Sequence, residues 1–151
     1  MNYKPGAIGA LTDEYEKALN ELKVVLNSIS EEVFLATNEL NALDFQSIRN
    51  IVSHIISSGY IYSNYARKSF GMNIVSYNVN LNSIDSVATE IDKMFSYHIK
   101  TFENRWLMSD GEMMKTIIVT SWTTYDLEAL MEHAIVHILR HRLQIQKMIE
   151  V

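Results

Sequence analysis

Apolar residues recur at three- and four-residue steps in four stretches of the chain, which is the spacing of one face of an α-helix. Charged and polar residues fill the positions between them. The stretches cover residues 8–29, 48–66, 84–102 and 127 to the C-terminus. The pattern therefore predicts an all-α protein with four amphipathic helices that bury their apolar faces against one another.

Polar residues of the kinds that cap helices stand near the predicted helix starts. Asp44 is the predicted cap of the second helix, and Asn82 or Ser83 opens the third. Thr123 or Thr124 precedes the fourth helix, where two acidic residues follow at the positive end of the helix dipole. These residues set the expected N-terminal limits of three of the four helices.

Two connections between the predicted helices lack helical periodicity. Residues 72–81 are rich in asparagine, so we expect a long loop before the third helix. Asp110-Gly111 indicates a turn, and the β-branched run 116–120 is compatible with a short strand or with an extended loop over the helices. No internal repeat or interdomain linker occurs, and 151 residues suit one core, so a single domain over 1–151 is expected.

The composition is that of an ordinary globular protein. Hydrophobic residues make up 48% and charged residues 21%, and one proline and five glycines leave few helix breakers. The absence of cysteine excludes disulfides, thiolate nucleophiles and thiolate zinc sites. The 13 basic residues are scattered and outnumbered by 18 acidic ones, giving a net charge of -5. Nucleic acid is therefore not an expected partner.

The sequence also bears on location and assembly. No stretch reaches the roughly 18 uninterrupted apolar residues that a membrane span needs. The first residues lack the apolar core of a signal peptide, so we expect a cytoplasmic protein without membrane contact. A homodimer is expected, because eight methionines and exposed tyrosine and tryptophan residues suit a contact between helix faces.

Three of the five histidines lie on the fourth predicted helix, at positions 133, 137 and 141. Residues four apart share one face of a helix, a spacing with which two imidazoles can hold one metal ion. His133 and His141 are about 12 Å apart along the axis, whereas a Zn–N bond is about 2.0–2.1 Å long. One ion can therefore use His133 with His137, or His137 with His141, but not all three.

A third ligand would have to come from another helix, and His98 and His54 are the candidates. Periodicity alone favours His98, which continues the apolar face of the third helix. His54 lies off the centre of its helix's apolar stripe, among small polar residues that line either a cleft or a solvated face. A purely structural role stays open for all five histidines, because a histidine on a helix is more often a surface or hydrogen-bonded residue than a ligand.

The last helix resembles that of a known family. The run Asp126–Ile145 contains H-x-x-x-H-x-x-x-H-R-L-Q-I, which is similar to the C-terminal helix of the DinB/YfiT-like superfamily of four-helix metalloproteins. The run Asp44–Ile55 resembles the second helix of that family, in which a histidine follows a similar lead-in. Helix number, helix order and the long connection before the third helix also agree. The resemblance implies a four-helix bundle of up-down-down-up type.

The resemblance also implies a ligand set. In that family one histidine of the second helix and the last two of the fourth-helix motif bind the metal, which here are His54, His137 and His141. His98 then becomes a core or partly buried polar residue. His133 becomes a neighbour of the site or a hydrogen-bonding partner of a ligand.

Three further positions bear on the resemblance. Leu143 replaces a frequent glycine, and we expect the bulkier side chain to narrow a packing contact. Ser58 and Gly59 stand where relatives often carry a glutamate, which leaves any acid–base role unassigned. Gln144, three residues after His141, either points toward the site or makes a contact between helices.

Three neutral imidazoles with an open coordination position suit zinc or nickel best, with iron and cobalt as further candidates, and fit magnesium or calcium poorly. At the open position a water can be activated, or a thiol or carbonyl substrate polarised. The resemblance thus implies a metal-dependent enzyme, either a thiol-dependent S-transferase or a hydrolase, acting on a small-molecule substrate with a low-molecular-weight thiol as candidate cosubstrate. Two alternatives stay open: a non-catalytic metal-binding protein, and a helical interaction protein with structural histidines.

Overall fold

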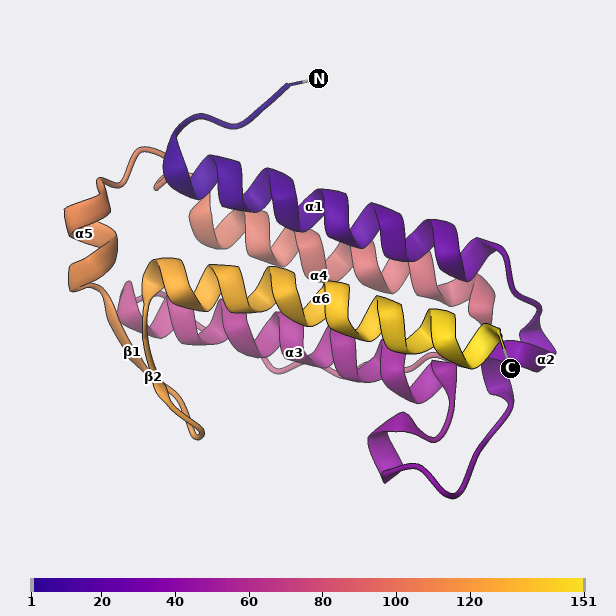
Figure 1. The fold of residues 1–151 in the computed structure, drawn as a ribbon. Helices are drawn as coiled ribbons and strands as arrows, with labels where there is room; N and C mark the ends of the chain where they lie inside the picture. Colours follow the sequence, from indigo (N-terminus) through magenta and orange to yellow (C-terminus); the bar gives the residue numbers. More distant parts are fainter. Residues whose placement is uncertain (1, 151) are drawn as a thin grey trace.

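The computed structural model describes residues 2–150 (Figure 1). Within that range the chain is mostly helical, as the periodicity predicts, and includes a small two-stranded sheet. The four long helices are α1 (Gly6–Asn27), α3 (Ile48–Ser69), α4 (Val87–Phe102) and α6 (Leu127–Ile149). The short elements are α2 (Glu31–Leu35), α5 (Asp110–Lys115), β1 (Ile117–Val119), β2 (Thr124–Asp126) and two 3-10 turns over Leu43–Phe45 and Ile84–Ser86.

The four long helices lie side by side, with α1 and α3 each packed against both α4 and α6 (Figure 1). Glu31, which follows α1, accepts a hydrogen bond from the backbone N–H of Ile84 in the 3-10 turn directly before α4, so α1 and α4 run in opposite directions. Phe70 and Phe102 are in contact at the C-terminal ends of α3 and α4, which therefore run the same way. The ion pair between Glu21 and Arg142 joins α1 and α6 in parallel. These directions bring the C-terminal half of α6 beside the first half of α3.

The apolar faces of the four long helices form the core. Leu22, Ile55, Ile91 and Met94 are fully inaccessible to solvent there. Gly59 marks a close approach within this core: a Cβ atom at this position would lie 2.4 Å from the sulfur of Met94 and 2.9 Å from the hydroxyl oxygen of Tyr15. A side chain as small as alanine is therefore not accommodated at this point of α3 without a shift of its neighbours.

The start of α3 differs from the expectation. Ser47 caps the helix and accepts a hydrogen bond from the backbone N–H of Asn50, whereas Asp44 lies in the preceding 3-10 turn. A capping side chain must reach an N–H group of the first helical turn, so only the residue directly before that turn can serve. The prediction that Asp44 caps this helix is therefore wrong.

The start of α6 differs in the same way. Asp126 is the cap and accepts from the backbone N–H of Ala129, whereas Thr124 begins β2. In the antiparallel pair Ile117 stands opposite Asp126, and Val119 opposite Thr124. The run 116–120 thus contains a short strand, and its pairing places the first helical residue after position 126.

The expected turn at Asp110-Gly111 is also wrong, because both residues belong to α5. Ser109 accepts from the backbone N–H of Glu112, while the Glu112 carboxylate accepts from the backbone N–H and the hydroxyl of Ser109. This reciprocal capping starts a helix where the Asp-Gly pair alone favours a turn.

Among residues 2–150, no helix combines the length and the hydropathy needed to cross a bilayer.

Candidate metal centre

Three histidines from two helices meet between α3 and α6. Nε2 of His137 lies 3.1 Å from Nε2 of His54 and 3.2 Å from Nε2 of His141. One ring nitrogen from each histidine lies within 4.8 Å of the other two. The fold therefore brings together the same three residues that the family resemblance implies. We refer to His54, His137 and His141 as the histidine triad.

Helix geometry accounts for the arrangement. His137 and His141 are one turn apart on α6 and share a face, and α3 presents His54 to that face from the opposite side. His137 and His141 are buried, whereas His54 is half-buried. The ring of Phe45 stacks on His141 and meets His54 edge-on, each at 5.5 Å between centroids, which holds both imidazoles in place.

Hydrogen bonding alone does not account for the contacts within the triad. A neutral imidazole has one N–H and one lone pair. Nδ1 of His141 lies 2.8 Å from Oε1 of Gln144 and donates to it, so Nε2 of His141 carries the lone pair. Nε2 of His137 has a single in-plane site and cannot bond to both His54 and His141. The two contacts of His137 therefore cannot both be hydrogen bonds, and three imidazole nitrogens this close together suit a cation better than a hydrogen-bonded chain.

The spacing also fits a metal ion. In a tetrahedral site with Zn–N bonds of about 2.0–2.1 Å, two ligand nitrogens lie about 3.4 Å apart. The two nitrogen distances from His137 are 3.1 and 3.2 Å, which is close to that value. Nδ1 of His137 is buried and has no hydrogen-bond partner among the described residues. His141, by contrast, has its ring orientation fixed by the hydrogen bond to Gln144.

The electrostatic setting favours neutral imidazoles. Burial, together with the smaller effect of the neighbouring imidazoles, lowers the pKa of His137 to about 3. Burial also lowers the pKa of His54 and of His141, against smaller opposing effects of the Asp44 carboxylate on His54 and of Gln144 on His141. The triad is consequently uncharged at neutral pH, which is the form that binds a metal.

His133 lies next to the triad but outside it. Its ring centroid is 6.2 Å from that of His137, and its ring packs against Tyr62, Tyr125 and Trp122. His133 is thus a neighbour of the site, one of the two roles that the resemblance implies. The eight-residue step to His141 keeps it away from the common point, as helix geometry requires.

His98 lies in another part of the core. Its Nε2 is 3.1 Å from Oγ1 of Thr12 on α1, and its ring packs among Tyr15, Phe95 and Phe102. Burial lowers its pKa to about 3. The periodicity that favours His98 as a ligand identifies a buried face correctly, but that face meets α1 and not the space between α3 and α6.

The structure shows how Gln144 and Leu143, the two residues that follow closely after His141, are oriented. Gln144 points to the site, where it accepts from His141. Leu143 has 51% of its surface exposed, so about half of its side chain lies outside the core; the narrowed packing contact stays a prediction. On α6, residue 143 faces outward because it is half a turn away from His141.

A polar hollow of about 450 Å³ adjoins the triad at His54. Its walls come from the turn before α3 and from one polar face of α3: Leu43, Asp44, Asn50, Ser53 and Ser57. Small polar neighbours of His54 therefore line a hollow, which is the first of the two alternatives, a cleft or a solvated face, that the sequence leaves open. Solvent and a small molecule can approach His54 from this side.

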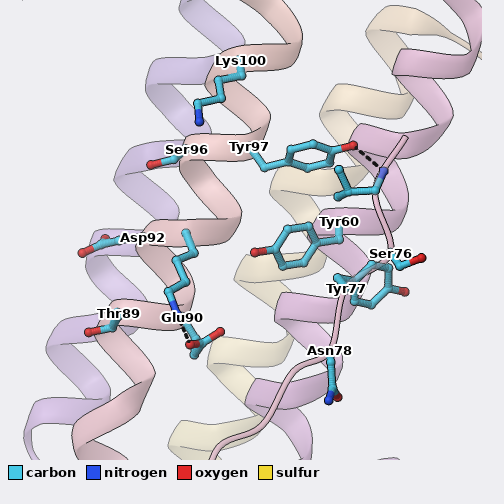
Figure 2. Close-up of a pocket in the computed structure, with 12 residues that line it drawn as sticks. Tyr60, Ser76, Tyr77, Asn78, Thr89, Glu90, Asp92, Ser96, Tyr97 and Lys100 are labelled. Carbon is cyan, nitrogen blue, oxygen red and sulfur yellow. Dashed lines mark hydrogen bonds and ion pairs between the residues drawn. The ribbon is translucent and has the colours of Figure 1, made fainter. Parts of the chain in front are cut away.

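A larger groove of about 700 Å³ lies between α4 and residues 75–78 (Figure 2). The stacked rings of Tyr60 and Tyr77 line it, with centroids 5.0 Å apart. Its half-buried carboxylate, Glu90, is paired with Lys93, and the hydroxyl of Tyr97 accepts from a backbone N–H and donates to a side-chain amide. These polar groups already satisfy one another, so the triad is the stronger candidate for chemistry.

Comparisons of the chain with protein-family models, with curated proteins and with solved structures found no match. The class of the protein is therefore defined by its own fold and site: a mostly α-helical protein with a histidine triad between two of its long helices.

Proposed function

We propose that the protein binds one divalent transition-metal ion through His54, His137 and His141. The observation that carries the proposal is the grouping of three imidazole nitrogens within 4.8 Å of one another, with Nε2 separations of 3.1 and 3.2 Å about His137. We further propose that the four long helices are the up-down-down-up bundle of the DinB/YfiT-like superfamily, which the motif in α6 and the lead-in to His54 resemble.

The donor set supports a particular group of metals. Three neutral nitrogen ligands suit zinc or nickel, with iron or cobalt as further candidates, and suit magnesium or calcium poorly. The hydrogen bond from His141 to Gln144 supports this assignment, because a partner on the second ring nitrogen fixes the tautomer and orientation of a ligating histidine.

We propose that the site is catalytic, in a thiol-dependent S-transferase or a hydrolase that acts on a small molecule. A bound ion of this kind lowers the pKa of a coordinated water or stabilises a thiolate. The chain itself contributes the hollow beside His54, where Asp44, Asn50 and Ser53 offer a carboxylate, an amide and a hydroxyl to a polar substrate. We place this activity in the cytoplasm and assign it no nucleic-acid or membrane partner.

One observation favours a second candidate, a metal-binding protein without catalysis. His137 and His141 are buried, and Phe45 covers one face of His141. An ion held there would join α3 to α6 and stabilise the fold, as closed structural sites do. The distinction depends on whether the fourth coordination position admits an exogenous ligand. A third candidate, an interaction protein with structural histidines, requires that no ion bind at all.

The test is elemental analysis of protein purified without an affinity tag or chelator, with the His54→Ala variant in parallel. We expect about one zinc, nickel, iron or cobalt per chain in the parent and little in the variant. No metal after reconstitution would refute the proposal.

Cobalt substitution then separates the two metal-binding candidates. A change in the visible spectrum on adding a small thiol indicates an open position and supports catalysis. A tetrahedral spectrum that the thiol leaves unchanged indicates a closed structural site.

A further inference from the structure

The outward face of α6 is unusually apolar for a helix surface. Six positions between its ends are exposed: Glu132, Val136, Leu139, Arg140, Leu143 and Lys147. Val136, Leu139 and Leu143 have 52%, 38% and 51% of their surfaces exposed. By contrast, the exposed positions of α4 carry only alanine and polar residues. The solvent face of a packed helix is normally polar. The apolar stripe of Val136, Leu139 and Leu143 is therefore a candidate contact surface for another protein chain.

The six exposed positions are symmetric about the midpoint between Leu139 and Arg140. Two copies of α6 packed antiparallel about that midpoint would set Val136 of each copy opposite Leu143 of the other. They would also set Glu132 opposite Lys147 at both ends of the contact. Such a self-complementary patch is what a twofold homodimer interface requires.

Charge selects the antiparallel arrangement over the parallel one. A parallel pair would place the two Glu132 carboxylates together at one end and the two Lys147 ammonium groups together at the other. The antiparallel pair replaces both repulsions by attractions. Arg140 lies nearest the midpoint and is exposed; its aliphatic stem can cover apolar surface while the guanidinium stays in water at the edge of the contact.

We propose that α6 forms the interface of a symmetric homodimer, with Val136, Leu139 and Leu143 at its centre and two Glu132–Lys147 ion pairs at its ends. The occupant of the apolar stripe is thus a second copy of this chain. The triad histidines point to the other side of α6, so the dimer does not depend on bound metal.

Features beyond α6 would enlarge the contact. Trp122 in the hairpin lies beside His133 at the start of α6, and the 3-10 turn that holds Phe45 lies beside His141 near its end. Trp122 and Leu43 have 48% and 74% of their surfaces exposed. In Figure 1 the hairpin and the segment before α3 extend beyond the helices at opposite ends. An antiparallel pair brings the hairpin of one copy toward the turn of the other. The surface that these two segments bury would help the contact to reach the roughly 1,000 Å² of buried area that a specific interface needs.

Sedimentation equilibrium of the whole protein, with and without zinc, tests the proposal. The parent should be a dimer in both conditions, and Leu143→Glu should be a monomer. Glu132→Lys and Lys147→Glu should each weaken dimerisation by roughly tenfold or more, because two attractions at the rim of the contact become two repulsions. The double variant Glu132→Lys/Lys147→Glu should restore the parent value. Recovery in the double variant distinguishes a lost contact from a misfolded chain.

Ile74→Glu is the matched control, because Ile74 is also 47% exposed but lies in the segment before α4. It should leave the dimer unchanged. A parent that is monomeric at all concentrations would overturn the proposal, and so would a dimer that survives both Leu143→Glu and the single charge reversals. Either result would leave the metal site untouched, since metal content is measured separately.

Discussion

Nε2 of His54 on α3 lies 3.1 Å from Nε2 of His137 on α6, although 83 positions separate the two residues in the sequence. Neither helix can form this contact alone, and none of the elements that lie between α3 and α6 in the sequence supplies a member of the triad. The contact therefore depends on how α3 packs against α6. An ion held there would be sensitive to any change in that packing.

The first prediction separates the ligand candidates. His137→Ala and His54→Ala should each reduce bound metal from about one ion per chain to nearly none, because two imidazoles hold a transition metal far more weakly than three. His98→Ala should retain the metal, since His98 bonds to Thr12 in another part of the core. Elemental analysis of each folded variant gives the ranking. Loss of metal in His98→Ala with retention in His54→Ala would contradict the assignment.

The second prediction concerns Gln144. Gln144→Leu should weaken metal binding by roughly 10- to 100-fold, because His141 loses the hydrogen bond that fixes its tautomer. Competition with a chelator of known affinity measures the change. Gln146→Leu serves as the control, since no side-chain hydrogen bond of Gln146 touches the triad, and an equal effect in both variants would argue against the role of Gln144.

The third prediction is a pH dependence of folding stability in the metal-free protein. His98 is buried as the neutral form with its pKa lowered to about 3, whereas the unfolded value is near 6.5. The unfolded chain therefore binds the extra proton first as the pH falls. Stability is fully present above pH 6.5 and is lost between there and about pH 3, at up to about 1.4 kcal/mol per pH unit.

Urea unfolding of the metal-free protein at several pH values measures this slope. The His98→Gln variant is less stable at pH 7, because the contact with Thr12 changes, but its stability should fall less steeply on acidification. The difference in slope between parent and variant isolates His98 from the triad histidines, which titrate in both. Equal slopes would show that His98 is not buried in the neutral form.

The fourth prediction tests the close approach of α3 to α4. Gly59→Ala should destabilise the fold by about 1–3 kcal/mol, since the new Cβ would lie 2.4 Å from the sulfur of the buried Met94. This destabilisation is what remains after the roughly 1 kcal/mol that alanine gains in helix propensity. Gly111→Ala in α5 is the control, because its nearest neighbour would be 3.9 Å away. Denaturant unfolding should show the control unchanged or slightly more stable.

Local patterns in the sequence predicted most of the helical structure. The apolar steps located the four long helices, because burial of one face imposes a 3.6-residue period on each. The local signals were less reliable at the helix ends. Asp44 and Thr124 are good capping residues, but the 3-10 turn and the strand that contain them move the helix starts to other residues. Strand pairing and capping boxes depend on neighbours that a single-residue preference does not include.

The four-residue spacing alone places His137 and His141 on one face of a helix, because four residues make about one turn whatever the rest of the chain does. It did not determine which histidine faces them. Periodicity favoured His98, and only the resemblance to a family favoured His54. The tertiary structure decided this point, because an apolar face indicates that a residue is buried but not which helix covers it. The face with His98 packs on α1, while α3 brings His54 to the triad.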